Sequence, residues 1–435
     1  MSEQAVTLPA PPAPLVRSRL RLPTGAALLS IGTLASGVLA YVFNLAAARA
    51  LGPVEYGSVA VLWAAMFLVS VVLFRPAEQT LARNIAERQA RGEDAMAVVR
   101  TVGWLTLGAL AAVCAVFALA WTPLTDAFFN GRDAFSVCLL AGIAAYAASY
   151  YARGVASGLQ WLSGYGVLLL IDGLARVVLL LPLLMVASAH VASAAIVGAA
   201  VLGTLAPLAL RGFGPRQVLA KLRGTAAGPL KLGDAARFAV PVGVVAGAEQ
   251  TLVSGGALLA VLTASGDAAA AGTVFAATML VRAPVFLFQG VAAALLPRFT
   301  ELHTRGEHRR IRRALLAAGA GTLTLTGALV AGALVCGPEL MRLLFGPGFD
   351  VARGDLAILS AGVGCYLAAA TLTQAALARE LAARTALAWL TAAVAFVAVE
   401  LFVGGSPLHG VSVAFTVATG LAAAGLALVL HRSRN

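Results

Sequence analysis

The sequence predicts an all-α polytopic membrane protein of about twelve transmembrane helices in two pseudo-symmetric six-helix bundles, with both termini in the cytoplasm. Three observations predict this fold class: the composition, the placement of the cationic residues, and an internal repeat. Hydrophobic residues make up 60% of the 435 residues and charged residues only 11%, and the mean hydropathy is +0.90. Because soluble domains carry about 25% charged residues, this composition excludes an ordinary soluble protein.

Twelve apolar blocks are each long enough to cross the ~30 Å hydrocarbon core of a bilayer as a helix. The first block follows a polar tail over residues 1–23, and it is too long to be the apolar region of a cleaved signal peptide. Short turns such as Gly52–Gly57 are expected to close helical hairpins. The predicted spans cover residues 25–50, 57–82, 98–124, 135–157, 162–187, 189–210, 236–264, 269–296, 312–336, 354–377, 383–404 and 409–431.

The 31 lysines and arginines are distributed unevenly between the two sides of the predicted membrane. With the N-terminus inside, 25 fall in inner segments, four in outer segments and two, Arg176 and Arg282, within spans. Inner loops of membrane proteins carry an excess of Lys and Arg, so both termini are predicted to be cytoplasmic in a multi-pass protein of the cell membrane. The formal net charge of +12 is then a topology signal, and we expect no nucleic-acid partner.

Two pairs of segments indicate a duplication. Ile85–Asp94 resembles Phe299–His308 at an offset of 214 residues, and Pro123–Gly131 resembles Pro338–Gly346 at an offset of 215. Each half contains six predicted spans, so the halves share one orientation, as in transporters that rock about a cavity between two bundles. The predicted domains are a cytoplasmic tail (1–23), an N-terminal bundle (24–210), a basic cytoplasmic linker (211–235), a C-terminal bundle (236–431) and a second tail (432–435).

No catalytic or nucleotide-binding motif is present in the sequence. It lacks the P-loop, HExxH and GxSxG patterns, and its only lysines are Lys221 and Lys231. The four cysteines show no CxxC spacing, which favours free thiols packed among helices. The sequence therefore predicts neither an enzyme nor a cofactor or metal.

The candidate functional residues are the ionisable ones inside spans, since each costs ~3 kcal/mol unless it is paired or faces a cavity. Arg282 is near the middle of the eighth span and shares a helical face with Gln289. Arg176 lies four residues after Asp172 in the fifth span, and Glu249 is central in the seventh. In the functional interpretation, these residues line a polar cavity whose arginines hold an anionic group such as a phosphate.

A structural interpretation is available for each of these residues. Asp172 and Arg176, at positions i and i+4, are able to neutralise each other. Arg282 and Glu249 are able to form a bridge between the consecutive seventh and eighth helices. From the sequence alone, both alternatives remain open beside the cavity interpretation.

Three further groups of polar residues lie within the spans. Asn44 forms a helical stripe with Tyr41, which makes Asn44 a cavity candidate, although such stripes more often join helices. The stripe of Tyr and Arg over residues 146–153 has the same two interpretations, helix packing or a platform for a sugar. Arg75 and Glu78 fall late in the second span, where their side chains are expected to snorkel to the inner surface.

Several motifs are similar to those of one known family. Ala48–Gly57, the turn between the first two spans, resembles the opening hairpin of the polysaccharide (O-antigen-type, Wzx-like) flippases of the multidrug/oligosaccharidyl-lipid/polysaccharide exporter superfamily. Similar segments recur in the second half at Arg237–Pro241, Pro297–Gly306 and Gly337–Phe349. The likeness extends over residues 24–431.

The resemblance implies a MATE-like fold of two bundles around a central cationic cavity. It further implies alternating-access transport of an undecaprenyl-diphosphate-linked oligosaccharide across the cytoplasmic membrane. The implied partners are this substrate, membrane lipid, and the polysaccharide polymerase and glycosyltransferases of the same pathway. Ser254–Gly256 lacks the acidic residue that many relatives carry there, which leaves ion coupling at that position in doubt. The competing hypotheses are an ion-coupled exporter of small molecules and a membrane scaffold without transport activity.

Overall fold

The computed structural model describes residues 24–209, 214–226, 228, 230, 232–264, 266–285 and 308–432. Within these ranges the chain is almost entirely helical, and its only β pairing is an isolated bridge between Glu93 and Thr225. The helices are α1 (Thr24–Ala90), α2 (Met96–Leu119), α3 (Trp121–Phe129), α4 (Asp133–Gly158), α5 (Leu162–Val178), α6 (Ala189–Leu205), α7 (Pro215–Leu222), α8 (Leu232–Thr263), an unlabelled helix over Ala268–Val285, α10 (His308–Phe345), α11 (Arg353–Leu377), α12 (Ala382–Phe402) and α13 (Pro407–Arg432).

The predicted number of spans is confirmed. In the described ranges, eleven helices are long and apolar enough to cross a membrane, and α1 contains two spans. The chain reverses inside α1 at Gly52, whose φ of 71° and ψ of 174° are open to glycine but not to other residues. As a result, the rings of Phe43 and Trp63 stack at 5.6 Å, whereas a straight helix would separate them by about 30 Å.

Some span boundaries differ from the prediction: the helix expected to end at residue 82 continues to Ala90, the one expected to end at residue 336 continues to Phe345, and two others end early. The span expected over residues 98–124 ends at Leu119, because Ala120 has non-helical backbone angles (φ −124°, ψ 33°), and α3 follows as a separate short helix. The span expected over residues 162–187 is α-helical only to Val178. It continues as the 3-10 turn Leu181–Leu184, where Pro182 lacks the N–H that an α-helix would need.

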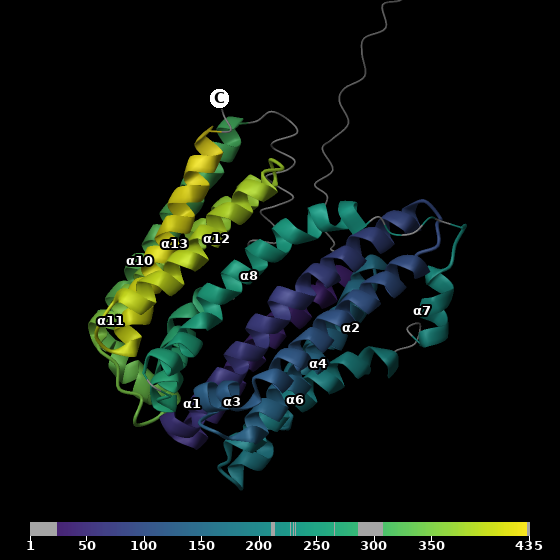
Figure 1. The fold of residues 1–435 in the computed structure, drawn as a ribbon. Coiled ribbons are helices and arrows are strands. Elements are labelled where there is room, and N and C mark those ends of the chain that lie inside the picture. The colour runs from purple at the N-terminus through teal and green to yellow at the C-terminus, as the bar shows by residue number, and fades with distance from the viewer. Residues whose placement is uncertain are drawn as a thin grey trace, which may run out of the picture.

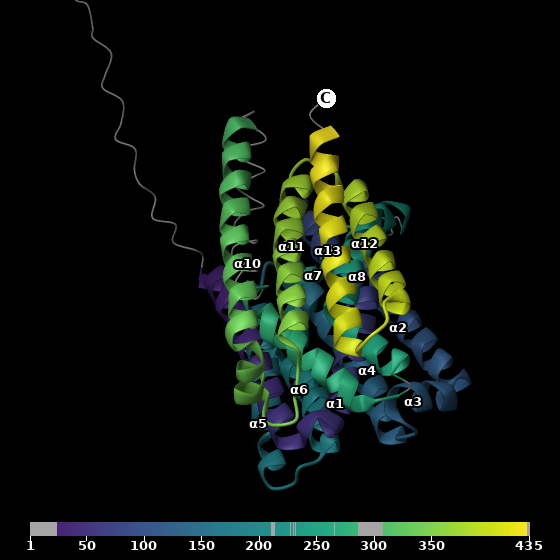
Figure 2. The same ribbon diagram turned by 90° about the vertical axis from the view of Figure 1, so that its left-hand side faces the viewer.

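The helices pack as two groups. In one, α1 contacts α4 and α5, and α6 contacts both of these; in the other, α11 contacts α10 and α13, and α12 contacts α8 and α13. The groups touch along α1 and α8, and Figure 1 shows them meeting near the reversal of α1 and diverging toward the end of α13. In Figure 2, the group of α10, α11, α12 and α13 lies in front of the other. The exact domain boundaries, the symmetry of the halves and the cytoplasmic side remain predictions.

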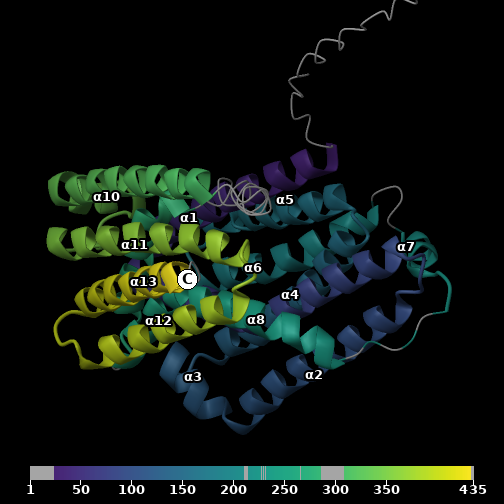
Figure 3. The ribbon, with the colours of Figure 1, turned by 90° about the horizontal axis from the view of Figure 1, so that it is seen from above.

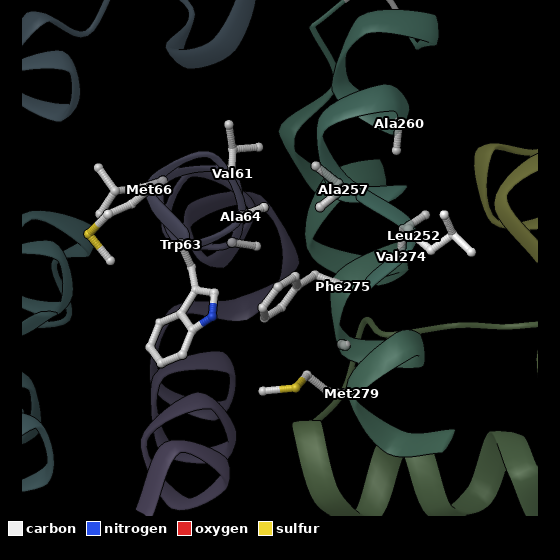
Figure 4. Packing of buried hydrophobic residues seen from close by; sticks show 14 of the residues in the cluster. Val61, Trp63, Ala64, Met66, Leu252, Ala257, Ala260, Val274, Phe275 and Met279 are labelled. Atoms are coloured by element: carbon white, nitrogen blue, oxygen red, sulfur yellow. The ribbon is translucent and has the colours of Figure 1, made fainter. Parts of the chain in front are cut away.

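Small residues allow close packing of helices within a group, and aromatic residues pack between the two groups. Gly32 and Gly166 allow α1 and α5 to approach closely, because a Cβ on Gly32 would lie 2.3 Å from the Gly166 carbonyl oxygen. Between the groups, Figure 4 shows Trp63 of α1 beside Phe275 and Met279 of the helix Ala268–Val285. The outward faces of α2 and α10 are largely apolar and exposed, as expected of lipid-facing helices.

Candidate functional site

A cavity of about 570 Å³ lies between the two groups of helices. Its walls come from α1, α4 and α5 on one side and from α8, the helix Ala268–Val285 and α11 on the other. The charged residues among its lining are Arg75, Arg153, Asp172, Arg176, Glu249 and Arg282. Arginines therefore outnumber carboxylates four to two, which makes the cavity cationic.

Arg176 is held by its own surroundings. Its guanidinium forms an ion pair with Asp172, and its Nη2 donates to the Tyr146 hydroxyl at 2.9 Å. The guanidinium carbon also lies 5.0 Å from the centre of the Trp63 ring. The side chains of Arg176 and Asp172 are only 2% and 6% exposed, so the mutual neutralisation considered from the sequence is confirmed. Both residues border the cavity, but their charges cancel locally.

Arg282 is less fully satisfied. Its Nη1 donates to the Val253 carbonyl of α8 at 2.9 Å, which orients the guanidinium along the cavity wall. Its buried Nε has no hydrogen-bond partner among the residues that the structure describes. Arg282 and Glu249 both line the cavity but form no ion pair with each other, so the proposed bridge between these two residues was wrong.

Glu249 lies on the α8 side of the same cavity, half-buried and without a hydrogen bond to another described residue. Its neighbour Gln250 also faces the cavity, and its amide donates to the Ser254 hydroxyl at 2.6 Å. The position of Glu249 leaves its carboxylate accessible to a ligand within the cavity.

The structure adds two arginines that sequence reasoning did not assign to the cavity. Arg75 was expected to snorkel to the inner surface, but its side chain is exposed into the cavity. Arg153 was counted with the cytoplasmic cations, but it is only 9% exposed and borders the cavity, with its guanidinium 4.9 Å from the centre of the Tyr150 ring. Within the described ranges, the buried Nε of Arg153 has no hydrogen-bond partner.

The Tyr and Arg stripe of α4 was the signal that could have located Arg153. Tyr146, Tyr150 and Arg153 are spaced by four and three residues, so they share one helical face. Glu78 was also expected at the inner surface, but it is 4% exposed and accepts a hydrogen bond from the Tyr165 hydroxyl at 2.6 Å. Depth along a helix was therefore a poor guide to what these side chains face.

The last two candidate residues have different outcomes. Asn44 is 1% exposed, donates to the Ala40 carbonyl at 2.8 Å and accepts from the Tyr56 hydroxyl at 3.0 Å. It joins the two spans of α1 and is absent from the lining of this cavity, so its assignment as a cavity residue was wrong. Gln289 lies outside the described residues.

Comparison with known sequences identifies related proteins. A family model described as "Polysaccharide biosynthesis protein" matches residues 22–303. The uncharacterized protein Rv1510 of Mycobacterium tuberculosis (strain ATCC 25618 / H37Rv) is 28% identical over 390 residues, or 89% of this chain and 85% of that protein. A second protein of the same strain, Rv3630, is 29% identical over 397 residues, or 86% of this chain and 87% of that protein.

Solved structures share the fold. An inward-facing multidrug resistance MATE family transporter of the MOP superfamily superposes with a TM-score of 0.69 at 16% identity, over 93% of this chain and 94% of that one. An outward-facing MATE family transporter of the MOP superfamily gives 0.65 at 16% identity, over 94% and 95% of the two chains. At these identities the likeness concerns the fold alone, and it confirms the predicted MATE-like arrangement.

Proposed function

The chain belongs to the polysaccharide biosynthesis protein family, and from this we propose that it is a membrane transporter that translocates a lipid-linked saccharide by alternating access. Its substrate class would be an oligosaccharide or related polysaccharide precursor carried on undecaprenyl diphosphate. The membrane would be the cytoplasmic membrane, and the enzymes that make and polymerise the saccharide would be its functional partners.

The observation that carries this proposal is the cationic cavity between the two groups of helices. Of its four arginines, Arg176 is neutralised by Asp172, and Arg75, Arg153 and Arg282 together exceed the one remaining lining carboxylate, that of Glu249, so the cavity retains positive charge for an anion. A guanidinium offers a planar fork of donors that matches the oxygens of a phosphate. In the described part of the chain, the buried Nε atoms of Arg153, Arg176 and Arg282 all lack a hydrogen-bond partner, but only Arg176 has a carboxylate within ion-pair distance.

The arrangement of the helices is consistent with alternating access. The two groups meet near the reversal of α1 and diverge at the opposite end (Figure 1), and the cavity lies between them. Rocking of one group against the other, with separation of this contact as the opposite end closes, would expose the cavity to alternate sides of the membrane. A lipid-linked substrate would keep its apolar chain in the bilayer while its charged headgroup crossed through the cavity.

An ion-coupled exporter of small molecules is the alternative, and Glu249 is the observation that favours it. This carboxylate faces the cavity without an ion pair to any described residue, so it is placed to attract a cationic drug or a coupling ion. The excess of arginines over carboxylates in the same cavity argues for an anionic cargo instead.

The deciding experiment is deletion of the gene followed by extraction of lipid-linked saccharides. We expect an undecaprenyl-diphosphate-linked saccharide to accumulate on the cytoplasmic side and to disappear when the wild-type gene is restored. An exporter of small molecules would instead leave the lipid-linked pool unchanged and make the deletion strain sensitive to cationic drugs.

A further inference from the structure

A short basic surface lies on the segment that joins the two groups of helices. It is formed by Arg216, Leu219, Lys221 and Arg223, on and directly after α7, and we call it the linker surface. All four side chains are exposed. Figures 1 and 3 both place α7 at the periphery of the molecule, beyond the ends of α1 and α2.

The backbone of this segment is fixed to the group of α1–α6. The N–H of Ala95 donates to the Leu222 carbonyl at 2.8 Å, and that of Asp94 donates to the Thr225 carbonyl at 2.8 Å. Thr225 donates in turn to the Gly92 carbonyl at 2.9 Å. Arg88 extends the attachment, with its Nη2 2.6 Å from the Gly228 carbonyl.

Apolar packing determines which side of α7 faces outward. Leu222 is 2% exposed and belongs to a buried cluster with Leu81 and Ile85 of α1 and Val98 of α2. With that side of α7 buried, the charged side is held away from the protein. The linker surface is therefore a fixed feature of the fold, presented in one orientation.

Nearby carboxylates do not neutralise the linker surface. Glu87 and Glu93 both pair with Arg91, and Asp94 accepts a hydrogen bond from the backbone N–H of Met96 at 2.8 Å. Within the described part of the chain, the three cations of the linker surface form no ion pair. The three cations form a local concentration of positive charge that is free to bind an anion from outside the protein.

The neighbouring helix α2 indicates where the membrane begins. Trp104 is 69% exposed on α2, and Arg100 is exposed one turn earlier on the same face. Tryptophan favours the level of the lipid headgroups, and arginine near a helix end extends toward them. Ala95, which binds the linker, lies about 14 Å along the helix from Trp104, on its N-terminal side. The linker surface thus adjoins the headgroups on the side that carries most of the cations.

We propose that the linker surface binds the headgroups of anionic phospholipids in the inner leaflet. Clustered Lys and Arg residues next to a membrane are attracted to anionic lipid over about one Debye length. Leu219, 41% exposed among the cations, adds an apolar contact of the kind that interfacial helices make. Because the segment is attached to α1–α6, this contact anchors that group to the membrane surface while the other group moves.

The test compares lipids retained by the full-length protein. The variant carries Arg216→Gln, Lys221→Gln and Arg223→Gln, and the matched control carries Arg342→Gln and Arg353→Gln, which remove exposed cations that pair with Asp350 and Glu339 at the other end of the molecule. Each purified protein is exposed to equal amounts of phosphatidylglycerol and phosphatidylcholine, and the bound lipids are counted by native mass spectrometry.

We expect wild type and control to prefer phosphatidylglycerol, and the triple variant to lose at least about fivefold of that preference with an unchanged melting temperature. Equal preference in all three proteins would overturn the proposal and redirect the search to an acidic protein partner. Equal loss of both lipids by the triple variant would overturn it too, because the effect would not concern charge.

Discussion

Arg176 and Arg282 both lie within membrane spans, yet their surroundings differ. Arg176 has a carboxylate, a hydroxyl and an aromatic face as partners, whereas Arg282 has one backbone carbonyl. The Nε atoms of both arginines are buried without a hydrogen-bond partner among the described residues, so the difference between them is the countercharge of Asp172 beside Arg176. At the scale of single residues, we therefore expect Arg176 to act mainly in packing and Arg282 to be the stronger candidate for substrate binding.

The first prediction concerns Arg282. Arg282→Lys keeps the charge but loses the planar fork of donors, so transport should fall about tenfold or more while the melting temperature stays near that of wild type. Because Glu249 is not its partner, adding Glu249→Ala to Arg282→Ala should not restore stability. Complementation of the deletion strain and thermal melting measure the two effects. Full transport by Arg282→Ala would exclude a substrate contact.

The second prediction concerns the buried ion pair. Asp172→Asn leaves the guanidinium of Arg176 without a countercharge at 2% exposure, and it should lower stability by about 3–5 kcal/mol. Replacing both charges, with Arg176→Gln added, should recover part of the loss. As a control, Glu339→Gln breaks an exposed pair with Arg353 and should cost at most ~1 kcal/mol. A fall in melting temperature no larger than that of the control would refute the structural role.

At the scale of elements, the reversal of α1 brings backbone against backbone. A Cβ on Gly57 would lie 1.7 Å from the Ala268 carbonyl oxygen, and one on Gly272 would lie 2.4 Å from the Pro53 carbonyl oxygen. Arg49 crosses to the other group at the same end and donates to the Leu343 carbonyl at 2.6 Å. These contacts join the two groups where they converge, and transport would require them to separate.

The third prediction tests this contact. Gly57→Ala places a methyl group where a carbonyl oxygen of the other group stands, so the contact should open, with a cost of roughly 1–3 kcal/mol. Gly108→Ala is the matched control, because a Cβ there meets nothing within 4 Å. The readout is thiol labelling of Ser254→Cys in the cavity from the outer side. If the cysteine is labelled no faster in the Gly57→Ala variant than in the Gly108→Ala variant, this contact does not close the cavity.

At the scale of the whole molecule, orientation in the membrane decides the direction of transport. The divergent end of the two groups is the end at which α13 finishes (Figure 1), and the cation distribution predicts that this end is cytoplasmic. With that topology, the diverging ends of the two groups would lie at the leaflet in which a lipid-linked precursor would be assembled.

The fourth prediction follows from that orientation. Cysteines placed at Ser2 and Asn435, which lie outside the described residues, should resist an impermeant thiol reagent in intact cells and react after permeabilisation. A cysteine at Ser406, in the loop between α12 and α13, should react in intact cells. Reaction of either terminal cysteine in intact cells would show that the predicted topology is wrong.

The sequence by itself determined the helical fold, the number of spans and the arginines at mid-span. The length of an apolar segment and the cost of placing a charge in the membrane are properties of the segment itself. They can therefore be recognised without knowing which helices are neighbours. The resemblance of the loop motifs to those of a known family likewise predicted the MATE-like fold.

Only the tertiary structure decided which polar side chains meet. Counting residues gives the depth of a side chain but not the direction it faces, which explains the misplacement of Arg75, Arg153 and Asn44. The two groups diverge, so the cavity reaches residues that lie near the inner surface by residue count. The hydrogen-bond partners of Arg176 and Arg282 also differ, because each partner lies on the helix that packs against the arginine. The pairing of Arg176 with Asp172 followed from their i, i+4 spacing, but only the packing of the helices showed that Arg75, Arg153 and Arg282 border the same cavity.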